Sequence, residues 1–270
     1  MPEGDSVWKV ARRLDDALLG RRLERADLRV PRLATSDLTG RTVEANATHG
    51  KHLLTRLSGD LTLHTHLRMD GSWTVTRPGR RLPARLMGDV RVVLATAGGP
   101  TAYGILLPVV ELVATSQEAS VVGHLGPDPL REDWDPEEAV RRLGADPARP
   151  LVSALLDQRL MAGLGNLWAN ELCFIAGRSP WTPVAEVDLA GVVRTAARAL
   201  RHSARVPGAY QVTTGRGRRG EDHWVAGRYR RPCRRCGTPV QMVPEIANDP
   251  DNRRTWWCPA CQPGPGRGSG

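Results

Sequence analysis

Residues 232–262 read PCRRCGTPVQMVPEIANDPDNRRTWWCPACQ and contain two pairs of closely spaced cysteines. Cys233 and Cys236 form the first pair, and Cys258 and Cys261 form the second after 21 intervening residues (237–257). Two such pairs are typical of a tetrahedral zinc site in which four thiolates fill every coordination position. The spacing therefore predicts one structural Zn²⁺. Two surface disulfides are the alternative, and a reducing compartment disfavours them.

The segment between the cysteine pairs predicts a β-hairpin, because a polar turn separates two short stretches with strand character. The hairpin would carry Arg253 and Arg254 at its tip, followed by Trp256 and Trp257. A basic tip above an aromatic base suits binding to nucleic acid. The alternative is that the tryptophans cover the zinc and the arginines are only solvated.

The charge balance points in the same direction. Lys and Arg total 38 against 29 Asp and Glu, which gives a net charge of +9. A basic protein favours a polyanionic partner, because its side chains displace counterions condensed on nucleic acid. No stretch approaches the roughly 20 apolar residues that span a bilayer, and the first residues lack the pattern of a signal peptide. We therefore expect a cytoplasmic protein.

Periodicity divides the chain into parts of different character. Residues 7–19 follow helical spacing, and short apolar runs such as 53–57, 61–67, 90–95 and 109–113 predict strands of an antiparallel sandwich. We expect an N-terminal domain over 1–115, a linker over 116–135, a helical domain over 136–230, a zinc finger over 231–262 and a flexible tail over 263–270. Helices are predicted at 137–144, 151–157, 166–175 and 188–203, and the Arg- and Gly-rich region 205–230 is expected to be irregular and mobile.

A glycine-rich turn separates two of these helices in LLDQRLMAGLGNLWANELCF, residues 155–174. Asn166 is a suitable N-cap for the second helix, and backbone N–H groups at a helix start can bind a DNA phosphate. The alternative is an ordinary packing unit of two helices and a turn. Cys173, inside the second helix, is interpreted as a small buried hydrophobic residue.

The N-terminus places a proline at position 2. If Met1 is removed, Pro2 carries a secondary amine beside the start of the first helix, whose dipole favours the unprotonated nucleophile. Such an amine forms a charged iminium with a sugar carbon at the aldehyde level, and Glu3 is placed for general acid–base catalysis. The alternative is a proline in the first helical turn with no chemical role.

Five blocks of the sequence, taken together, resemble one family along nearly the whole chain. They are MPEGDSVW (1–8), GKHLL (50–54), HLRMDGSW (66–73), LLDQRLMAGLGN (155–166) and PCRRCG…RRTWWCPACQ (232–262). The chain is similar to the formamidopyrimidine-DNA glycosylase/endonuclease VIII family. The resemblance implies a multidomain α+β fold. Its parts are an N-terminal β-sandwich with flanking helices, a helix–two-turns–helix domain and a C-terminal four-cysteine zinc-finger β-hairpin, with DNA between the lobes.

The resemblance also assigns roles to single residues. Pro2 matches the Schiff-base nucleophile, Glu3 the proton donor and Lys51 the catalytic lysine that contacts a DNA phosphate. Asn166 matches a phosphate-binding asparagine, and Arg253 matches the phosphate-binding arginine of the zinc finger, with Arg254 as the adjacent alternative.

Met69 matches the position from which a side chain enters the gap left by a flipped nucleotide. A core methionine is the alternative for this residue. The other residues that fill the gap are expected within 96–108, where TAGGPTAYGILLP departs from the family patterns and assigns none of them.

The implied activity is that of a DNA-repair glycosylase with AP lyase activity, acting as a monomer on damaged double-stranded DNA in the cytoplasm, at the nucleoid. MPEGDSVW, GKHLL and the short segment TTGRGRRGEDHWV (213–225) favour oxidised pyrimidines, whereas HLRM favours oxidised purines. A DNA-binding protein without catalytic activity on the same scaffold is the other alternative, although it would need neither Pro2 nor Glu3.

Overall fold

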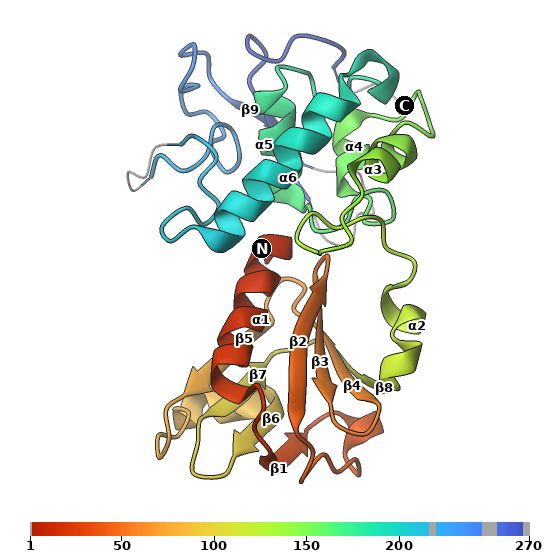
Figure 1. The fold of residues 1–270 in the computed structure, drawn as a ribbon. Coiled ribbons are helices and arrows are strands. Elements are labelled where there is room, and N and C mark those ends of the chain that lie inside the picture. The colour runs from red at the N-terminus through yellow and green to blue at the C-terminus, as the bar shows by residue number, and fades with distance from the viewer. Residues whose placement is uncertain (1, 216–219, 245–252, 267–270) are drawn as a thin grey trace. The chain divides into compact units, whose positions relative to one another are not determined.

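The computed structural model describes residues 2–215, 220–244 and 253–266, and the chain divides into two compact units, 1–124 and 125–270. Figure 1 shows the elements of both units. Unit 1 combines one long helix with two antiparallel sheets, and unit 2 combines helices with a short hairpin. The α+β class expected from the sequence is confirmed. None of the described helices is long and apolar enough to cross a membrane.

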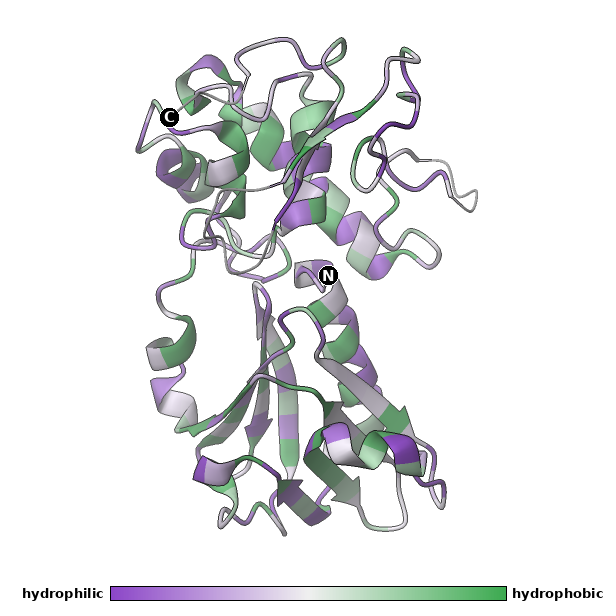
Figure 2. Cartoon of the chain, turned by 180° about the vertical axis from the view of Figure 1, so that it is seen from behind, coloured by the Kyte–Doolittle hydropathy of each residue, from purple (hydrophilic) through white to green (hydrophobic). Residues whose placement is uncertain are grey.

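Unit 1 contains two four-stranded sheets with strand orders β1-β6-β7-β5 and β2-β3-β4-β8. The first sheet comprises β1 (Leu23–Leu28), β5 (Ser72–Thr76), β6 (Val90–Thr96) and β7 (Thr101–Ile105). The second comprises β2 (Val43–His49), β3 (His52–Leu57), β4 (Leu61–His66) and β8 (Val109–Val113). The strands predicted at 53–57, 61–67, 90–95 and 109–113 are therefore present. Hydrophobic and hydrophilic residues are interspersed along the strands (Figure 2), and the first four residues of β4, LTLH, alternate between the two kinds.

Helix α1 (Gly4–Leu18) joins the two sheets into one core. It contacts β2 and β3 of one sheet and β5 and β7 of the other. Its fully buried Leu14 and Leu18 belong to the same hydrophobic cluster as Leu63 of β4 and Leu94 of β6. The predicted sandwich with a flanking helix is thus confirmed, and its core holds the N-terminal end of the chain in place.

A buried polar clamp fixes α1 on the second sheet. The backbone N–H and the side-chain Nδ2 of Asn46 in β2 both donate to Oδ1 of Asp15 in α1, at 3.0 and 2.9 Å. Thr55 Oγ1 of β3 donates to Oδ1 of Asn46 at 2.7 Å, and Arg12 Nη2 donates to the Asn46 carbonyl oxygen at 2.7 Å. Asn46 is 1% exposed, so these bonds replace its contacts with water.

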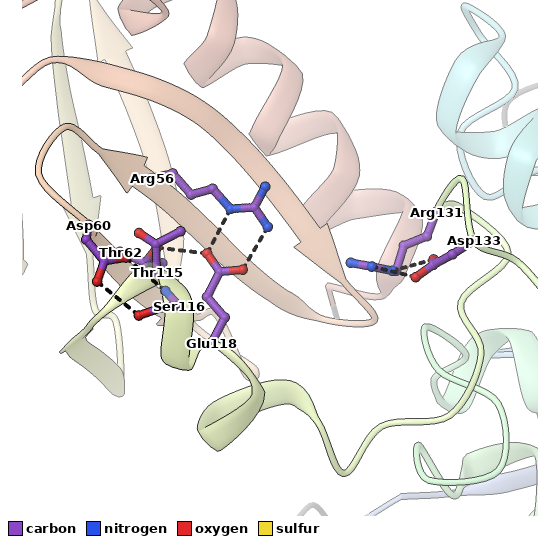
Figure 3. A network of polar contacts seen from close by, with 8 residues as sticks. All are labelled: Arg56, Asp60, Thr62, Thr115, Ser116, Glu118, Arg131 and Asp133. Carbon is purple, nitrogen blue, oxygen red and sulfur yellow. Dashed lines mark hydrogen bonds and ion pairs between the residues drawn. The ribbon is translucent and has the colours of Figure 1, made fainter.

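The segment after β8 folds back onto the second sheet and contains η3 (Thr115–Gln117) and α2 (Ala119–Val122). Figure 3 shows how it is attached. Glu118 accepts two hydrogen bonds from the Arg56 guanidinium and one from Thr62 Oγ1. Asp60 accepts from the backbone and hydroxyl of Ser116. The sequence predicts a linker over 116–135, and the first part of that stretch is a covering layer held by side-chain bonds.

Unit 2 contains α3 (Pro136–Leu143), α4 (Leu151–Leu156), α5 (Asn166–Ile175) and α6 (Leu189–Arg205), followed by the antiparallel pair β9 (Gln241–Val243) and β10 (Thr255–Trp257). The short 3₁₀ helices η1 (Pro31–Leu33) and η2 (Ala84–Asp89) lie in unit 1, and η4 (Val184–Glu186) lies in unit 2. The four predicted helices and the hairpin strands are present. Asp135 caps α3 by accepting from the backbone of Glu137 and Glu138, as its position before Pro136 indicates. Helix α5 contacts α4, α6 and β10.

We expect that Asn46→Ala lowers the free energy of unfolding by about 1–3 kcal/mol, because Thr55 and Asp15 lose a buried hydrogen-bond partner. Urea denaturation measures the change. Glu44→Ala, at an exposed position of the same strand, is the matched control and should change stability by less than about 0.5 kcal/mol. An equal response of the two variants would contradict the role of the clamp.

Candidate functional site

Pro2 and Glu3, two of the three predicted catalytic residues, lie at the N-terminal end of α1. Glu3 is the N-cap residue and the helix begins at Gly4, so Pro2 lies just before the helix. The alternative interpretation of Pro2 as the first helical residue is therefore wrong. The backbone N–H of Glu3 donates to Ser6 Oγ at 3.2 Å, and the Glu3 side chain is fully buried. A reactive amine at this place would lie in the positive field of the helix N-terminus.

Lys51 lies in the tight turn between β2 and β3, where Gly50 adopts a left-handed φ of +57°. The register of the hairpin pairs His49 with His52, which leaves Gly50 and Lys51 as the turn residues. A two-residue turn with positive φ is well suited to joining antiparallel strands. The register of the hairpin therefore places Lys51 at the end of the sheet, where its positive charge helps to lower the pKa of His66.

Met69 is exposed in the turn that follows β4. Its exposed fraction is 47%, so the alternative of a core methionine is wrong. Arg68 has a φ of +45°, and the N–H of Gly71 donates to the carbonyl oxygen of Leu67 at 2.9 Å. A side chain at position 71 would meet that carbonyl oxygen at 2.5 Å. Gly71 therefore closes the turn. Within this turn Arg68 has a left-handed backbone conformation, which is costly for a residue with a side chain.

Leu106 is a residue of the same kind that the sequence did not assign. It is 41% exposed, has a φ of +49° and directly follows β7. Because Ser72 of β5 pairs with Ile105 of β7, the turn containing Met69 and the residue Leu106 lie at the same end of this sheet. The available signal in the sequence was an apolar residue near glycine and proline in GILLP. Only the structure distinguishes Leu106, which is exposed and has a left-handed backbone conformation, from Leu107, which is buried.

A group of histidines near Lys51 was also not singled out from the sequence. His52 Nδ1 and His64 Nε2 are 2.8 Å apart, and His64 Nδ1 is 2.9 Å from Glu111 Oε2. The ring centroids of His52 and His66 are 4.7 Å apart. These residues come from β3, β4 and β8 and share one face of the sheet, because His52 pairs with His66 and His64 with Glu111.

The environment disfavours the charged form of two of these rings. Burial, followed by the fields of other histidines, lowers the pKa of His52 from 6.5 to about 3. Burial and the nearby positive charge of Lys51 lower the pKa of His66 to about 4. Both rings are therefore neutral near neutral pH in the unbound protein.

In unit 2, Asn166 connects helix α5 to the hairpin. The helix starts at Asn166 with Gly165 as its N-cap, so the prediction that Asn166 is the N-cap is wrong. Its Nδ2 donates instead to the carbonyl oxygen of Arg254 at 3.0 Å, and Asn170 Nδ2 donates to the same oxygen at 3.2 Å. The backbone N–H of Trp256 donates to Asn170 Oδ1 at 2.8 Å. The Asn166 side chain is thus bonded to a backbone oxygen far along the chain and does not cap α5.

Gln158 shapes the glycine-rich turn before α5. Its Nε2 donates to the carbonyl oxygens of Leu156 and Leu164, and its Oε1 accepts from the N–H of Gly163. Gly163 has a φ of +98°, a conformation that a residue with a side chain rarely adopts. The turn is therefore built as one unit that ends at Asn166. Cys173 is fully buried, as predicted.

Arg253 and Arg254 lie directly before β10, and residues 245–252, between the two strands, fall outside the described residues. The predicted place of the arginines at the hairpin tip therefore stays a prediction. The two side chains differ in their surroundings, because Arg253 is half-buried and Arg254 is exposed. The carbonyl bonds from Asn166 and Asn170 fix the backbone at this point. The backbone at Arg254 is thereby held next to the N-terminal end of α5.

Glu171 is a buried carboxylate that anchors a later segment to α5. It is fully buried and accepts hydrogen bonds at 2.8 Å from the backbone N–H groups of Trp224, Val225 and Ala226. Thr213 Oγ1 donates to it as well. The region 205–230, which is predicted to be irregular and mobile, is therefore bonded to α5 at Thr213 and again at Trp224–Ala226. Sequence reasoning missed Glu171, since an acidic residue within a helix gives no local signal of burial.

The four paired cysteines converge on one point. Their Sγ atoms lie within 4.8 Å of one another, with separations of 3.5 Å between Cys236 and Cys258 and 3.9 Å between Cys233 and Cys261. Tetrahedral zinc–sulfur bonds of about 2.3 Å place sulfur atoms about 3.8 Å apart, so these four residues fit a metal ion. The four cysteines are not disulfide-bonded, and the two-disulfide alternative is wrong.

Comparison with known proteins gives a consistent result. The family model of the formamidopyrimidine-DNA glycosylase N-terminal domain matches residues 1–103, and that of the H2TH domain of the same glycosylase matches residues 125–206. "Probable endonuclease 8 2" of Streptomyces coelicolor is 52% identical, covering 98% of this chain and 95% of the relative. "DNA-(apurinic or apyrimidinic site) lyase Nei2" of Mycolicibacterium smegmatis is 44% identical, covering 97% and 99%.

A solved structure of Lactococcus lactis Fpg in complex with DNA that contains an abasic site has a similar fold. Its TM-score is 0.77 at 23% identity, with 97% of this chain and 100% of that chain covered. At this level of identity the likeness concerns the fold.

We expect acid to destabilise the folded chain through the histidine group. Below pH 6.5 the unfolded chain binds protons at His52 and His66, while the folded chain resists them until about pH 3 and 4. The free energy of unfolding should therefore fall with decreasing pH, by up to about 1.4 kcal/mol per pH unit for each ring.

Urea denaturation across this range measures the slope. His52→Gln should reduce it, whereas His202→Gln, at an exposed position of α6, should not. A slope that is the same in the wild type and in His52→Gln would show that His52 is not held neutral.

Proposed function

Because the chain belongs to the formamidopyrimidine-DNA glycosylase family, we propose that it is a bifunctional DNA glycosylase and AP lyase of base-excision repair. The observation that carries the proposal is the arrangement at α1. Pro2 lies directly before the helix, and the adjacent Glu3 is fully buried at the N-cap. A protein that only binds DNA needs neither an N-terminal secondary amine nor a buried carboxylate beside it.

The chemistry starts with the nitrogen of Pro2 after removal of Met1. This nitrogen attacks C1′ of the damaged nucleotide, and the glycosidic bond breaks with the electron pair leaving on the base, which takes a proton assisted by Glu3. The Pro2 nitrogen then loses its proton, and the C1′–O4′ bond of the sugar breaks as O4′ takes up a proton, which leaves C1′ joined to Pro2 as an iminium. The iminium withdraws electrons, so that loss of a proton from C2′ expels the 3′ phosphate by β-elimination. A second, δ-elimination expels the 5′ phosphate. The helix dipole supports the unprotonated amine that the first step requires.

Several residues are proposed to hold the DNA. Lys51, Asn166 and Arg253 are assigned to backbone phosphates, with Arg254 as the alternative to Arg253. Met69 fills the gap left by the flipped nucleotide, and Leu106 adds a second apolar side chain at the same sheet end. This part of the proposal is supported by the exposure and the left-handed backbone conformations in this region, at Arg68 and Leu106.

The proposed lesions are oxidised pyrimidines, and formamidopyrimidine or 8-oxoguanine is the alternative. Support comes from the relative at 52% identity, which is named an endonuclease 8. The Met69 position, which resembles the purine type, supports the alternative. The partner is damaged or abasic double-stranded DNA, on which we propose that the protein acts as a monomer in the cytoplasm, at the nucleoid.

Zn²⁺ is the proposed metal, bound by Cys233, Cys236, Cys258 and Cys261. With all four positions taken by thiolates, it would supply structural stability and no activated water. The ion would fix the base of the hairpin, and hence the arginines before β10. Support comes from the separations between the sulfur atoms, which match a tetrahedral site.

Removal of the metal by a chelator should weaken binding to abasic duplex DNA before the helical content of the chain is lost, because the hairpin depends on it most directly. Fluorescence anisotropy measures the affinity, circular dichroism measures the helices, and elemental analysis should give about one zinc per chain. Cys236→Ser should behave like the stripped protein, and Cys173→Ala should retain the metal. Unchanged affinity after verified metal loss would contradict the role of the hairpin.

Borohydride trapping tests the proposed activity. Protein shown by intact mass to lack Met1 should form a covalent adduct with duplexes that carry an abasic site or 5-hydroxyuracil, because borohydride reduces the Pro2 iminium. Pro2→Thr should abolish the adduct. Glu3→Gln should retain cleavage at the abasic site and lose excision of the damaged base, since only the latter needs the proton donor.

The ranking of 5-hydroxyuracil against 8-oxoguanine decides the lesion class. Absence of an adduct on every duplex, from zinc-loaded protein without Met1, would favour a DNA-binding protein without catalysis. An equal loss of both activities in Glu3→Gln would contradict the role assigned to that residue.

A further inference from the structure

A hydrogen-bonded row of three side chains crosses the outer face of the sheet β2-β3-β4-β8. It runs from His52 through His64 to Glu111, with separations of 2.8 and 2.9 Å. The planes of the two imidazole rings differ by only 12°, so the bond between them lies close to both ring planes. His64, in the middle, is 3% exposed, and the Glu111 side chain at the far end is 46% exposed.

The order of the partners restricts where protons reside in this row. The Glu111 carboxylate only accepts, so His64 Nδ1 carries a hydrogen. In the neutral row, His64 Nε2 therefore accepts from His52 Nδ1, and His52 Nε2 is left as an acceptor. If the row gains one proton at His52 Nε2, the Nδ1 hydrogen of His52 passes to His64 Nε2. The charge then resides on His64 beside Glu111, and His52 Nε2 has become a donor.

We infer that His52, His64 and Glu111 form a proton relay, and that the relay takes up one proton when a DNA phosphate binds beside Lys51. His52 directly follows Lys51 in the chain, and the charge of Lys51 acts on His66, whose ring packs edge-on against His52 at 4.7 Å. A phosphate drawn to the lysine therefore approaches the first ring of the row. Uptake of the proton exchanges an acceptor for a donor at His52 Nε2. The three residues act as positioning residues for this phosphate, and the inference rests on the proposed function.

The groups around His52 explain why this ring is uncharged without DNA. His52 is surrounded by His49 of β2, His64 and His66 of β4, and His124 after α2, and together with burial these lower its pKa. Lys51 and Arg68 act on His66 in the same way. A phosphate supplies the negative charge that reverses this balance, while Glu111 already offers a counter-charge to His64.

His66 is not the site of uptake, although its ring lies edge-on to His52. The backbone N–H of Arg68 donates to His66 Nδ1 at 3.0 Å. Protonation of that nitrogen would break this bond, and Nε2 already carries the hydrogen of the neutral ring. The row that ends at Glu111 is therefore the more favourable place for the additional proton.

Calorimetric titration with a short duplex that contains a tetrahydrofuran abasic analogue tests the relay, because this duplex binds without being cleaved. Titrations at about pH 6.5 in two buffers of different ionisation enthalpy give the number of protons taken up. The wild type should take up close to one, and its dissociation constant should fall by up to about tenfold per pH unit of acidification.

Glu111→Gln is the decisive variant. The amide oxygen still accepts from His64 Nδ1, so the row remains bonded, but the counter-charge for the imidazolium is lost. We expect proton uptake to fall to near zero and the pH dependence of affinity to flatten. His52→Gln should give the same result by removing the outer ring, and His202→Gln on α6 should titrate like the wild type.

Wild-type binding without proton uptake, or uptake that persists in both Glu111→Gln and His52→Gln, would overturn the relay while leaving the proposed glycosylase and lyase activity intact. A wild type that neither binds the abasic analogue nor forms a borohydride adduct at about pH 8 would overturn the proposed function and the relay with it.

Discussion

The packing of helix α1 into the core of unit 1 is the interaction on which the proposed chemistry depends. Pro2 precedes the helix, so its position is set by how firmly the helix is held. Buried leucines such as Leu14 supply most of the attraction, but apolar contact is non-directional and leaves the rotation of a helix weakly defined. The hydrogen bonds of Asn46 to Asp15 provide the missing direction. Together they fix the positions of Pro2 and of the buried Glu3 at the start of the helix.

The sheet β2-β3-β4-β8 has two faces of different character, and each has its own task. Leucines at 53, 57 and 63 point toward the core, while His52, His64 and Glu111 lie on the other face. An outer sheet face is normally exposed to water. Here the segment after β8 is bonded to this face through Glu118, and burial lowers the pKa of His52. Neutral rings next to a lysine can respond to the arrival of an anion, which permanently charged residues cannot do.

Helix α5 has a corresponding organising role in unit 2. Asn166 and Asn170 bind the backbone before β10, and Glu171 binds the backbone around Trp224. A buried carboxylate without partners would be strongly destabilising, but backbone N–H groups satisfy this one. The helix thus connects the glycine-rich turn with two later segments, and polar side chains fix positions that apolar packing would leave loose.

The sequence by itself determined the features that depend on near neighbours along the chain. These are the periodicity of α1, the short apolar runs of the strands and the ligand set of the four cysteines, whose spacing already implies convergence. Only the tertiary structure decided features that depend on strand register or on distant partners. Asn166 is predicted to be the N-cap of α5, but its side chain donates to a carbonyl oxygen 88 residues away. Likewise, His52, His64 and Glu111 meet only because cross-strand pairing aligns three strands, and a register shift of one residue would reverse the faces on which they lie.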